Sequence, residues 1–555
     1  MKKILLLFIF CYSLPFVAQV TNEGQPVSWA SEIESNVTPI TLPKIDILKV
    51  KAEDKLHNEL PTKPFRVGIL HTVNSGLENA GIWTQLPNGD RIWRILFSSQ
   101  DAVHLSVIFD KFYLPKGAKI YLYNDDRTDL LGAYTETQNN EKRVLGTWFV
   151  NGDKLWIEYY EPKEVKGQGE LNLSTVIHGY RLGHTYQKGY LNSKEKALND
   201  SGDCNHDVDC PVGTDFESLK NELKKSVAFL NMGNGFICSG GLVNNTAQDK
   251  KPYFLTANHC FTDPNGIESN PANYTMRFNW ISPNPICAAT TNSTNGPTNF
   301  TMSGATLRAR NSNSDVMLVE INSAIPSNWD ITFAGWDKSD TNPTFEVGIH
   351  HPSGDIMKVC RDDTGAIKDV NAGAQTWEIT TVGGGWELGV TEGGSSGSPL
   401  FDQNGRVIGQ LFGGAAACSG TNDNGQLDYY GRFGISWDAG GTAATQLKDW
   451  LDPQNTNQNT LDILKNVLAI NDEFLEQNIT IFPNPTNGVL QIKVSGLVND
   501  LNYQVYNLLG QTLISDKLQN NKIIYLDNLQ SDIYFIRITE IDTNRSLVKK
   551  IIISK

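Results

Sequence analysis

Short segments of alternating apolar and polar residues, separated by turn-forming residues, run along the first third of this sequence. Between residues 19 and 196, the segments 104–109 and 118–123 alternate or nearly so on either side of a Pro-Lys-Gly turn. Alternation with a period of two is typical of strands that bury one face. We therefore predict that residues 19–196, which contain no cysteine, form a β-rich folded unit.

The middle of the chain continues this pattern with shorter strands. Apolar runs at 251–256, 315–321 and 406–412 lie between turns rich in glycine, asparagine and serine. Strands of this length at regular spacing favour a barrel or a sandwich. Near residue 450 the apolar positions change to helical spacing and predict one closing amphipathic helix. These positions are Ala443, Leu447, Trp450 and Leu451.

Polar stretches separate these units from each other and from a third one. Residues 192–203 are mostly polar and indicate an exposed linker that is open to proteolysis. A second polar stretch, 454–459, follows the predicted helix, and a further strand-rich unit runs from about residue 477 to residue 555. A chain of 555 residues with these breaks is expected to fold as two to four domains.

The N-terminus has the three parts of a secretory signal. Met1-Lys2-Lys3 is basic, residues 4–10 are apolar, and the small residue Ala18 suits a cleavage site. We predict that residues 1–18, including Cys11, are removed on export. A membrane anchor is the alternative, but the apolar stretch is shorter than the roughly 20 residues that a spanning helix needs.

The net charge of -14 is carried by the middle of the chain. Residues 197–465 hold 16 Lys and Arg against 30 Asp and Glu, so the remaining segments balance. An acidic surface argues against a nucleic-acid partner and favours cationic substrates, although solubility outside the cell explains it equally well.

Seven of the eight cysteines also lie in this middle segment. Clustered cysteines behind an export signal predict disulfides formed in an oxidising compartment. A metal site is disfavoured, because no pair has the CxxC spacing and only one histidine adjoins a cysteine. The cysteines are Cys204, Cys210, Cys238, Cys260, Cys287, Cys360 and Cys418.

A glycine- and serine-rich run, residues 393–399, contains the candidate nucleophile Ser396. A serine hydroxyl reacts only when a base takes its proton, an acid orients that base, and backbone N–H groups receive the developing oxyanion. The small residues allow a tight turn that aims the N–H groups of Gly394 and Ser396 into one pocket. Taken alone, a run of this composition is more often a structural turn.

His259 is the candidate base. It lies in Ala257-Asn258-His259-Cys260, directly after an apolar strand, which is a pattern of chymotrypsin-type proteases. A disulfide from Cys260, with Cys238 as the natural partner, would hold the loop that aims the imidazole. A Cys260 nucleophile is the alternative, disfavoured by that expected disulfide. The other histidines of the segment are expected to be solvated or structural loop residues: His206, His350 and His351.

Asp315 is the candidate orienting acid, because it opens the apolar strand 316–319 and so lies where a strand enters a barrel. The alternative is a solvated aspartate at a strand end. The order His259, Asp315, Ser396 is that of the chymotrypsin type and differs from subtilisin and the α/β-hydrolases.

Residues 201–465 resemble a narrower family, the bacterial lysyl endopeptidases of the chymotrypsin fold. The likeness rests on several motifs in matching order: 201–205, 238–246, 253–260, 334–337, 349–352, 389–399 and 449–453. The resemblance implies that His259, Asp315 and Ser396 form the catalytic triad. It also implies the disulfides Cys204–Cys418, Cys210–Cys287 and Cys238–Cys260, which leaves Cys360 as a free, buried thiol.

The resemblance also implies the substrate preference. The position of trypsin's pocket acid holds Val390, whereas the family places its acid after the serine, where Asp428 stands in this sequence. Asp428 would bind the ammonium of a lysine on the acyl side of the cut, with Glu392 as the rival acid. The family stacks a tryptophan on a histidine; Trp377 matches the tryptophan, but Phe412 replaces the histidine.

Both flanks resemble known modules. Residues 19–196 resemble the propeptide of these proteases, and Lys196–Ala197 suits self-processing after lysine. Residues 481–488, 505–511 and 549–551 resemble the C-terminal sorting domain of the Bacteroidetes type IX secretion system, which implies export across the outer membrane and the secretion machinery as a partner. An ordinary β-sandwich adhesion module is the alternative.

The predicted protein is mainly β: a chymotrypsin-like double β-barrel with a C-terminal helix, between a β-rich propeptide and a C-terminal β-sandwich. Its segments are a signal peptide (1–18), the propeptide (19–196), the protease domain (197–465), a linker (466–476) and the sorting domain (477–555). We expect a secreted or cell-surface serine endopeptidase that cleaves after Lys, or also Arg, needs no cofactor and is monomeric when mature. The alternatives are another cleavage preference, or a silent protease fold that binds ligands.

Overall fold

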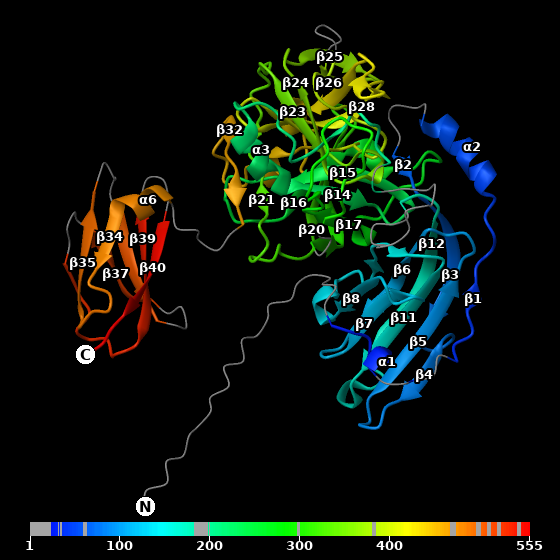
Figure 1. The fold of residues 1–555 in the computed structure, drawn as a ribbon, viewed down its shortest axis with the longest axis horizontal. Helices are drawn as coiled ribbons and strands as arrows, with labels where there is room; N and C mark the ends of the chain where they lie inside the picture. Colours follow the sequence, from blue (N-terminus) through cyan, green and yellow to red (C-terminus); the bar gives the residue numbers. More distant parts are fainter. Residues whose placement is uncertain are drawn as a thin grey trace, which may run out of the picture. The chain divides into compact units, whose positions relative to one another are not determined.

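The chain divides into two compact units, Met1–Asn466 and Val467–Lys555, in a computed structural model (Figure 1). The predicted signal peptide and the Lys196–Ala197 bond lie outside the described residues. The structure describes residues 24–30, 33, 36–58, 64–182, 198, 200–296, 300–379, 385–466, 473–495, 501–507, 512–518, 523–540 and 546–555.

Two sheets form the N-terminal part of the first unit, drawn in blue and cyan in Figure 1. The first contains β1 (Ile40–Thr41), β4 (Ile82–Gln85), β5 (Arg91–Ser98), β7 (Lys119–Asn124), β8 (Leu130–Tyr134) and β11 (Lys154–Glu161). The second contains β3 (Gly68–Gly76), β6 (His104–Tyr113), β9 (Leu145–Gly146), β10 (Val150–Asn151) and β12 (Glu170–Gly179). The helices α1 (Val27–Ala30) and α2 (Ile47–Asn58) accompany them. The alternating segments 104–109 and 118–123 thus fall in β6 and β7, as predicted.

The rest of the first unit is built on two larger sheets. One has the strand order β18-β17-β14-β15-β16-β20-β19, with β2 from the N-terminal part added to β15. The strands of this sheet are β2 (Phe65–Arg66), β14 (Val227–Asn231), β15 (Phe236–Leu242), β16 (Tyr253–Ala257), β17 (Thr275–Phe278), β18 (Thr301–Ser303), β19 (Ala305–Asn311) and β20 (Val316–Ile321).

The second large sheet follows the order β13-β24-β23-β27-β28-β31-β26-β25. Its strands are β13 (His206–Asp207), β22 (Trp336–Asp337), β23 (Glu346–His350), β24 (Lys358–Asp362), β25 (Ile367–Asn371), β26 (Ala374–Ile379), β27 (Pro399–Asp402), β28 (Val407–Gly414), β31 (Asp428–Arg432) and β32 (Thr460–Leu461). Two short pairs complete the unit: β21 (Thr332–Phe333) with β33 (Leu464–Lys465), and β29 (Cys418–Ser419) with β30 (Asn422–Asp423). The double-barrel, mainly β fold is confirmed.

Helices are few and short in this part of the chain. They are α3 (Glu217–Leu223), α4 (Phe433–Asp438) and α5 (Lys448–Leu451). The predicted closing helix is shorter than its apolar spacing indicated, because residues 443–445 form a turn and only Lys448–Leu451 are helical. Leu447 and Leu451 are nevertheless fully buried in the barrel core, so the apolar face was recognised correctly.

The second unit is a small β-sandwich with one apolar core. One sheet contains β34 (Ile479–Phe482), β35 (Val489–Val494) and β38 (Ile523–Tyr525), beside the helix α6 (Glu473–Asn478). The other contains β36 (Leu501–Tyr506), β37 (Thr512–Leu518), β39 (Ile533–Glu540) and β40 (Ser546–Ile552). A sandwich was the predicted fold of this segment.

Candidate active site

His259 and Asp315 meet because their strands are neighbours. The strands β16 and β20 pair antiparallel, with Ala257 opposite Val316. His259 follows the end of β16, and Asp315 precedes the start of β20, so both lie at the same edge of the sheet. Asp315 adopts a left-handed backbone conformation with φ 53°, which turns its side chain back across the pair.

Both carboxylate oxygens of Asp315 accept a hydrogen bond from His259. The ring Nδ1 lies 2.7 Å from Oδ2, and the backbone N–H of His259 donates to Oδ1 at 2.8 Å. Burial raises the pKa of Asp315, and the adjacent imidazole opposes that rise. A carboxylate that accepts the Nδ1–H leaves the lone pair on Nε2, which is the form that can take a proton from a nucleophile.

Ser396 is held by the strand β15 through backbone contacts. The N–H of Ser239 donates to the carbonyl of Ser396 at 2.8 Å, and the Ser239 hydroxyl donates to the carbonyl of Gly394 at 3.0 Å. The disulfide sulfur of Cys260 lies 3.9 Å from the Ser396 carbonyl oxygen and 4.0 Å from Nε2 of His259. The disulfide thus lies between the base and the nucleophile segment, and the three predicted residues share one site.

The loop before Ser396 turns at a glycine with a positive φ. Gly394 has φ 96°, a conformation that disfavours other residues, and the carbonyl of Gly393 accepts from the N–H of Ser353 at 2.6 Å. Because the Gly393 carbonyl is tied to Ser353, the N–H of Gly394 on the same peptide plane points the opposite way. Among the described residues, none accepts a hydrogen bond from the N–H of Gly394 or Ser396.

Asp428 lies at the start of β31 and is 1% exposed. Trp386 Nε1 and Thr391 Oγ1 donate to its Oδ2 at 2.8 and 2.7 Å, and the N–H of Ala416 donates to Oδ1 at 3.3 Å. Burial raises the pKa of Asp428 to about 6 despite these donors. None of the described cationic side chains forms an ion pair with it.

Gly414 lies directly against Asp428. A side chain at position 414, which pairs with Asp428 across β28 and β31, would overlap the carboxylate. Only glycine therefore lets the Asp428 carboxylate take this position. Trp386, Thr391 and Gly414 were not recognised in the sequence, where each stands in a turn or at a strand end without a distinctive pattern.

Phe412 and Trp377 have different surroundings. The Phe412 ring lies 5.8 Å from His259 and 5.4 Å from Tyr429, so it lines the base. Trp377 is 1% exposed, donates its indole N–H to the carbonyl of Ile408 at 2.9 Å and has Arg432 5.3 Å from its ring. Among the described ring contacts none joins Trp377 to Phe412.

Glu392 does not line the pocket around Asp428. Its carboxylate accepts from the N–H of Gly202 and from the hydroxyl of Ser353, both at 2.8 Å. Glu392 therefore connects Gly202, at the start of the barrel region, to Ser353, whose N–H donates to the Gly393 carbonyl. Burial raises the pKa of Glu392, opposed by these donors.

Of the two alternatives expected for the other histidines, solvated or structural, His350 and His351 are structural. His350 and His351 are fully buried. His350 shares a hydrogen bond of 2.7 Å with the hydroxyl of Ser395, and the ring of His351 stacks on Phe229 and Trp280. Burial lowers the pKa of both histidines, to about 3 and about 4. The sequence around these histidines does not reveal their burial, which arises from distant packing partners.

Three disulfides and one free cysteine are present in the described part of the chain. The bonded pairs are Cys204–Cys418, Cys210–Cys287 and Cys238–Cys260, the same pairs that the family resemblance implies. Cys360 is free and buried, and burial raises the pKa of its thiol far above the ordinary value.

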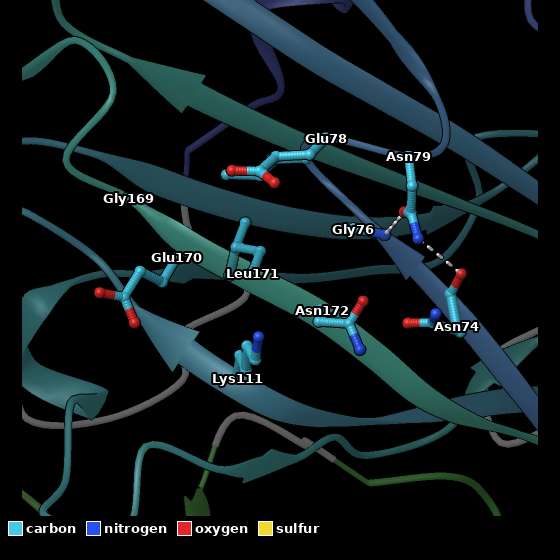
Figure 2. Close-up of a pocket in the computed structure, with 10 residues that line it drawn as sticks. Asn74, Gly76, Glu78, Asn79, Lys111, Gly169, Glu170, Leu171 and Asn172 are labelled. Carbon is cyan, nitrogen blue, oxygen red and sulfur yellow. Dashed lines mark hydrogen bonds between the residues drawn. The ribbon is translucent and has the colours of Figure 1, made fainter.

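The N-terminal part of the chain has a hollow of its own. A pocket of about 310 Å³ opens in the N-terminal sandwich between Asn74, Glu78, Lys111 and Glu170 (Figure 2), and none of the predicted site residues lines it. Within the described ranges, no group of three or more His, Cys, Asp or Glu could hold a metal ion.

A double barrel with a His–Asp pair beside a serine on a glycine turn is the arrangement of a serine protease. The family model for the lysyl endopeptidase C-terminal domain matches residues 198–431, and that for the secretion system C-terminal sorting domain matches residues 480–554. A lysyl endopeptidase from Pseudomonas aeruginosa is 27% identical over 390 residues, which cover 67% of this chain and 80% of the relative.

Two solved structures are also similar to parts of the chain. An inactive form of Rv3671c from M. tuberculosis H37Rv covers 39% of this chain and 84% of its own, at 15% identity and a TM-score of 0.25. The match to Deg5 covers 38% of this chain and 87% of the Deg5 chain, at 13% identity and a TM-score of 0.23.

These findings confirm the resemblance to the lysyl endopeptidases and to the type IX sorting domain. The protein is a serine endopeptidase that is secreted or displayed at the cell surface. No helix of the described chain is long and apolar enough to cross a membrane.

Proposed function

We propose that the protein cleaves peptide bonds on the carboxyl side of lysine, through a triad of Ser396, His259 and Asp315. The observation that carries the preference is Asp428, a buried carboxylate with three hydrogen-bond donors and no cation beside it among the described residues. A lysine ammonium supplies the missing counter-charge, and a charge-assisted hydrogen bond contributes about 1.5–3 kcal/mol.

In the proposed reaction, Nε2 of His259 removes the proton of the Ser396 hydroxyl, whose oxygen then attacks the carbonyl carbon after lysine. Asp315 accepts the Nδ1–H and stabilises the imidazolium that forms. The N–H groups of Gly394 and Ser396 hold the negative oxygen of the tetrahedral intermediate. His259 then gives the proton to the departing amine, and water hydrolyses the acyl-enzyme by the same steps in reverse roles.

Neutral side chains are expected to bind poorly in this pocket. A neutral side chain would cover Asp428 without forming an ion pair with it. A buried charge left without a partner costs free energy, so kcat/KM for such a substrate is lower. Arginine carries the right charge but a longer and wider head group, and Gly414 lies directly against the Asp428 carboxylate. We therefore expect lysine to be preferred over arginine.

Product mapping on a mixed peptide library tests the preference. We expect cuts after lysine, with arginine weaker; cuts after acidic or aromatic residues would reject the role of Asp428. The nucleophile is tested by Ser396→Ala, which we expect to lower kcat by roughly 10⁴- to 10⁶-fold. Ser419→Ala, which removes an exposed hydroxyl, is the matched control, and a fluorophosphonate probe should label only proteins that retain Ser396.

We further propose that residues 19–196 are a propeptide removed by cleavage at Lys196–Ala197. Support for this is the polar sequence that contains Lys194 and Lys196, since polar linkers between folded parts are preferred sites of proteolytic cleavage. Sequencing the mature N-terminus should return Ala197 in the wild type. Maturation at an unchanged position in a protein with both lysines replaced by glutamine would reject self-processing.

A further inference from the structure

Two consecutive glycines precede the serines of the proposed nucleophile loop. Gly393 and Gly394 carry no side chain that restricts the backbone, so these two residues alone do not fix the direction of the Gly394 N–H. That N–H is one of the two proposed donors to the substrate oxygen. Its direction therefore has to be imposed by contacts with other residues.

The turn formed by residues 392–396 is held through its carbonyl groups. All five carbonyl oxygens accept hydrogen bonds, at distances from 2.6 to 3.0 Å. The donors are the N–H of Ser395 to Glu392, the N–H of Ser353 to Gly393, the hydroxyl of Ser239 to Gly394, the N–H of Ser398 to Ser395 and the N–H of Ser239 to Ser396. Because the C=O and N–H of a trans peptide point in opposite directions, the bonds from Ser353 and Ser398 turn the N–H groups of Gly394 and Ser396 to the other side.

Ser395, directly before the proposed nucleophile, supplies a side-chain contact inside this turn. It is fully buried. Its hydroxyl oxygen accepts from the N–H of Glu392 at 3.2 Å and lies 2.7 Å from Nδ1 of His350. Its own N–H donates to the Glu392 carbonyl at 3.0 Å. The turn is thus closed twice between Glu392 and Ser395, and the Ser395 hydroxyl joins it to His350.

His350 reaches this turn from the last position of β23. The strands β23 and β27 pair antiparallel, with Gly348 opposite Leu400, so the end of β23 runs beside the start of the segment that follows Ser396. The ring is fully buried, and in the described part of the chain its Nε2 has no hydrogen-bond partner. The contact with Ser395 is therefore the hydrogen bond that fixes the ring and the turn relative to each other.

The imidazole of His350 is neutral. Burial lowers its pKa to about 3, and the neighbouring His351 and Lys358 act in the same direction. A neutral ring and a hydroxyl form a hydrogen bond without a buried net charge, which would cost far more free energy in this desolvated position. The pair therefore holds the turn at every pH at which a protease of this kind is assayed.

We propose that Ser395 and His350 are positioning residues of the protease reaction, whose buried hydrogen bond keeps the N–H groups of Gly394 and Ser396 directed at the substrate oxygen. This inference rests on the proposed role of Ser396 as the nucleophile. Neither residue touches the reacting atoms. Both act through the direction of the peptide groups in the turn 392–396.

Loss of this hydrogen bond should affect the transition state more than substrate binding. The negative oxygen of the tetrahedral intermediate needs both N–H groups in place, whereas the neutral carbonyl of the bound substrate depends on them much less. Without the Ser395 hydroxyl, the glycine pair gains freedom and the Gly394 N–H is no longer held in one direction. We therefore expect kcat to fall while KM stays nearly the same.

Ser395→Ala, introduced into the full chain, is the first test. We expect kcat to fall about 10- to 10³-fold, up to the cost of losing one oxyanion donor, with KM changed by less than about threefold. Ser282→Ala is the matched control, because Ser282 is also buried and its hydroxyl donates to the Asn284 carbonyl at 2.9 Å and accepts the Asn284 N–H at 3.3 Å. The thermal midpoint should fall in both variants, whereas kcat should fall in Ser395→Ala alone.

A pair of substitutions at His350 tests the hydrogen bond without changing Ser395. Asparagine branches at Cγ as histidine does, so its amide group lies near the position of Nδ1 and can bond to the Ser395 hydroxyl. Glutamine places its amide one bond further out, near the position of Nε2. We expect His350→Asn to retain kcat within about fivefold and His350→Gln to lose about as much as Ser395→Ala.

A peptide aldehyde reports on the N–H groups directly. The hydroxyl oxygen of Ser396 adds to the aldehyde carbon, and the former carbonyl oxygen takes the place of the oxyanion. The inhibition constant of the aldehyde should rise in Ser395→Ala by the factor by which kcat/KM falls. The corresponding peptide alcohol cannot form this adduct, and its inhibition constant should not change.

The outcomes separate this inference from the proposed function. A kcat within threefold of the wild type in Ser395→Ala, with activity lost in Ser396→Ala, overturns the inference alone. Equal losses in His350→Asn and His350→Gln, or weaker binding of the alcohol as well as the aldehyde, also overturn it. Activity that survives Ser396→Ala overturns the proposed nucleophile. If Ser395→Ala does not fold, as judged by secreted yield and thermal midpoint, the comparison of the two His350 variants decides.

Discussion

Replacing Asp428 by asparagine removes the charge that the proposed pocket offers to lysine while keeping its shape. The side-chain oxygen of asparagine can still accept from Trp386 and Thr391, whose donors lie 2.8 and 2.7 Å from Oδ2 of Asp428. The change therefore isolates the carboxylate charge from the hydrogen bonds that hold it.

The loss for a lysine substrate follows from the burial of the pair. A buried ion pair that loses one partner is weakened by about 3–5 kcal/mol, which corresponds to roughly two to nearly four orders of magnitude in kcat/KM. The free enzyme should change in the opposite direction. Burial raises the pKa of Asp428 from 3.8 to about 6, a shift that amounts to about 3 kcal/mol against the charged form, so Asp428→Asn should stabilise the unliganded fold at neutral pH by up to that amount.

The sign of the pH dependence is set by the same shift. Because the folded state holds this proton more tightly than the unfolded state, the contribution of Asp428 to stability is greatest below its unfolded pKa and is lost as the pH rises through about 6. Binding of lysine has the reverse dependence, since it needs the charged carboxylate and weakens as the pH falls below about 6.

The assay is the ratio of kcat/KM for a lysine peptide to that for its norleucine analogue, measured from pH 5 to pH 8. Cleavage of both peptides depends equally on the protonation of the triad, so the ratio removes that contribution to the pH dependence. We expect it to fall below pH 6 in the wild type and to be small and flat in Asp428→Asn, whereas Asp438→Asn, on the exposed end of α4, should resemble the wild type. A ratio that is independent of pH in the wild type, or unaltered in Asp428→Asn, would refute the reasoning.

Four further changes test other parts of the site. Asp315→Asn should lower kcat on the order of 10⁴-fold with little change in KM, because His259 loses the group that selects its tautomer; an effect of less than tenfold would argue against this orientation. Gly414→Ala should abolish cleavage of lysine peptides, as its Cβ overlaps Asp428, whereas Gly420→Asn, in open space at a left-handed position, should not. Replacing Cys204 and Cys418 by alanine opens a loop with a sequence separation of 214 residues, and urea unfolding should show a loss of about 5 kcal/mol in the chain-entropy model. Cys360 should react with a thiol reagent only after unfolding, because it is buried and its pKa is raised; rapid labelling of the native protein would contradict that burial.

Much of this site could be predicted because its signals are local. The residues around His259, Asp315 and Ser396 form short runs with a strand, a turn or a cysteine directly beside them, and their order along the chain is informative. Alternation of apolar residues identified β6, and short apolar runs between turns identified β16 and β20. Each of these features depends on neighbours within a few positions.

The partners of those residues could not be predicted in the same way. Trp386 and Thr391 lie 42 and 37 positions before Asp428 in the chain, and nothing in their own surroundings indicates a hydrogen bond to it. The sequence left open whether His350 and His351 are solvated or structural for a similar reason, because Phe229 and Trp280, which cover His351, are distant in the chain.

The sequence by itself identified the class of protein, a secreted serine protease with disulfides, and the candidates for its nucleophile, base and acid. Only the tertiary structure decided that Asp428 is desolvated, that Phe412 lines His259 and that β2 occupies the edge of β15 beside Ser396. The physical reason is range. Turn and strand preferences act over a few residues, whereas desolvation and strand register depend on which distant surfaces pack together. A two-residue strand such as Phe65–Arg66 is too short to show a sequence pattern, so its partner strand cannot be predicted.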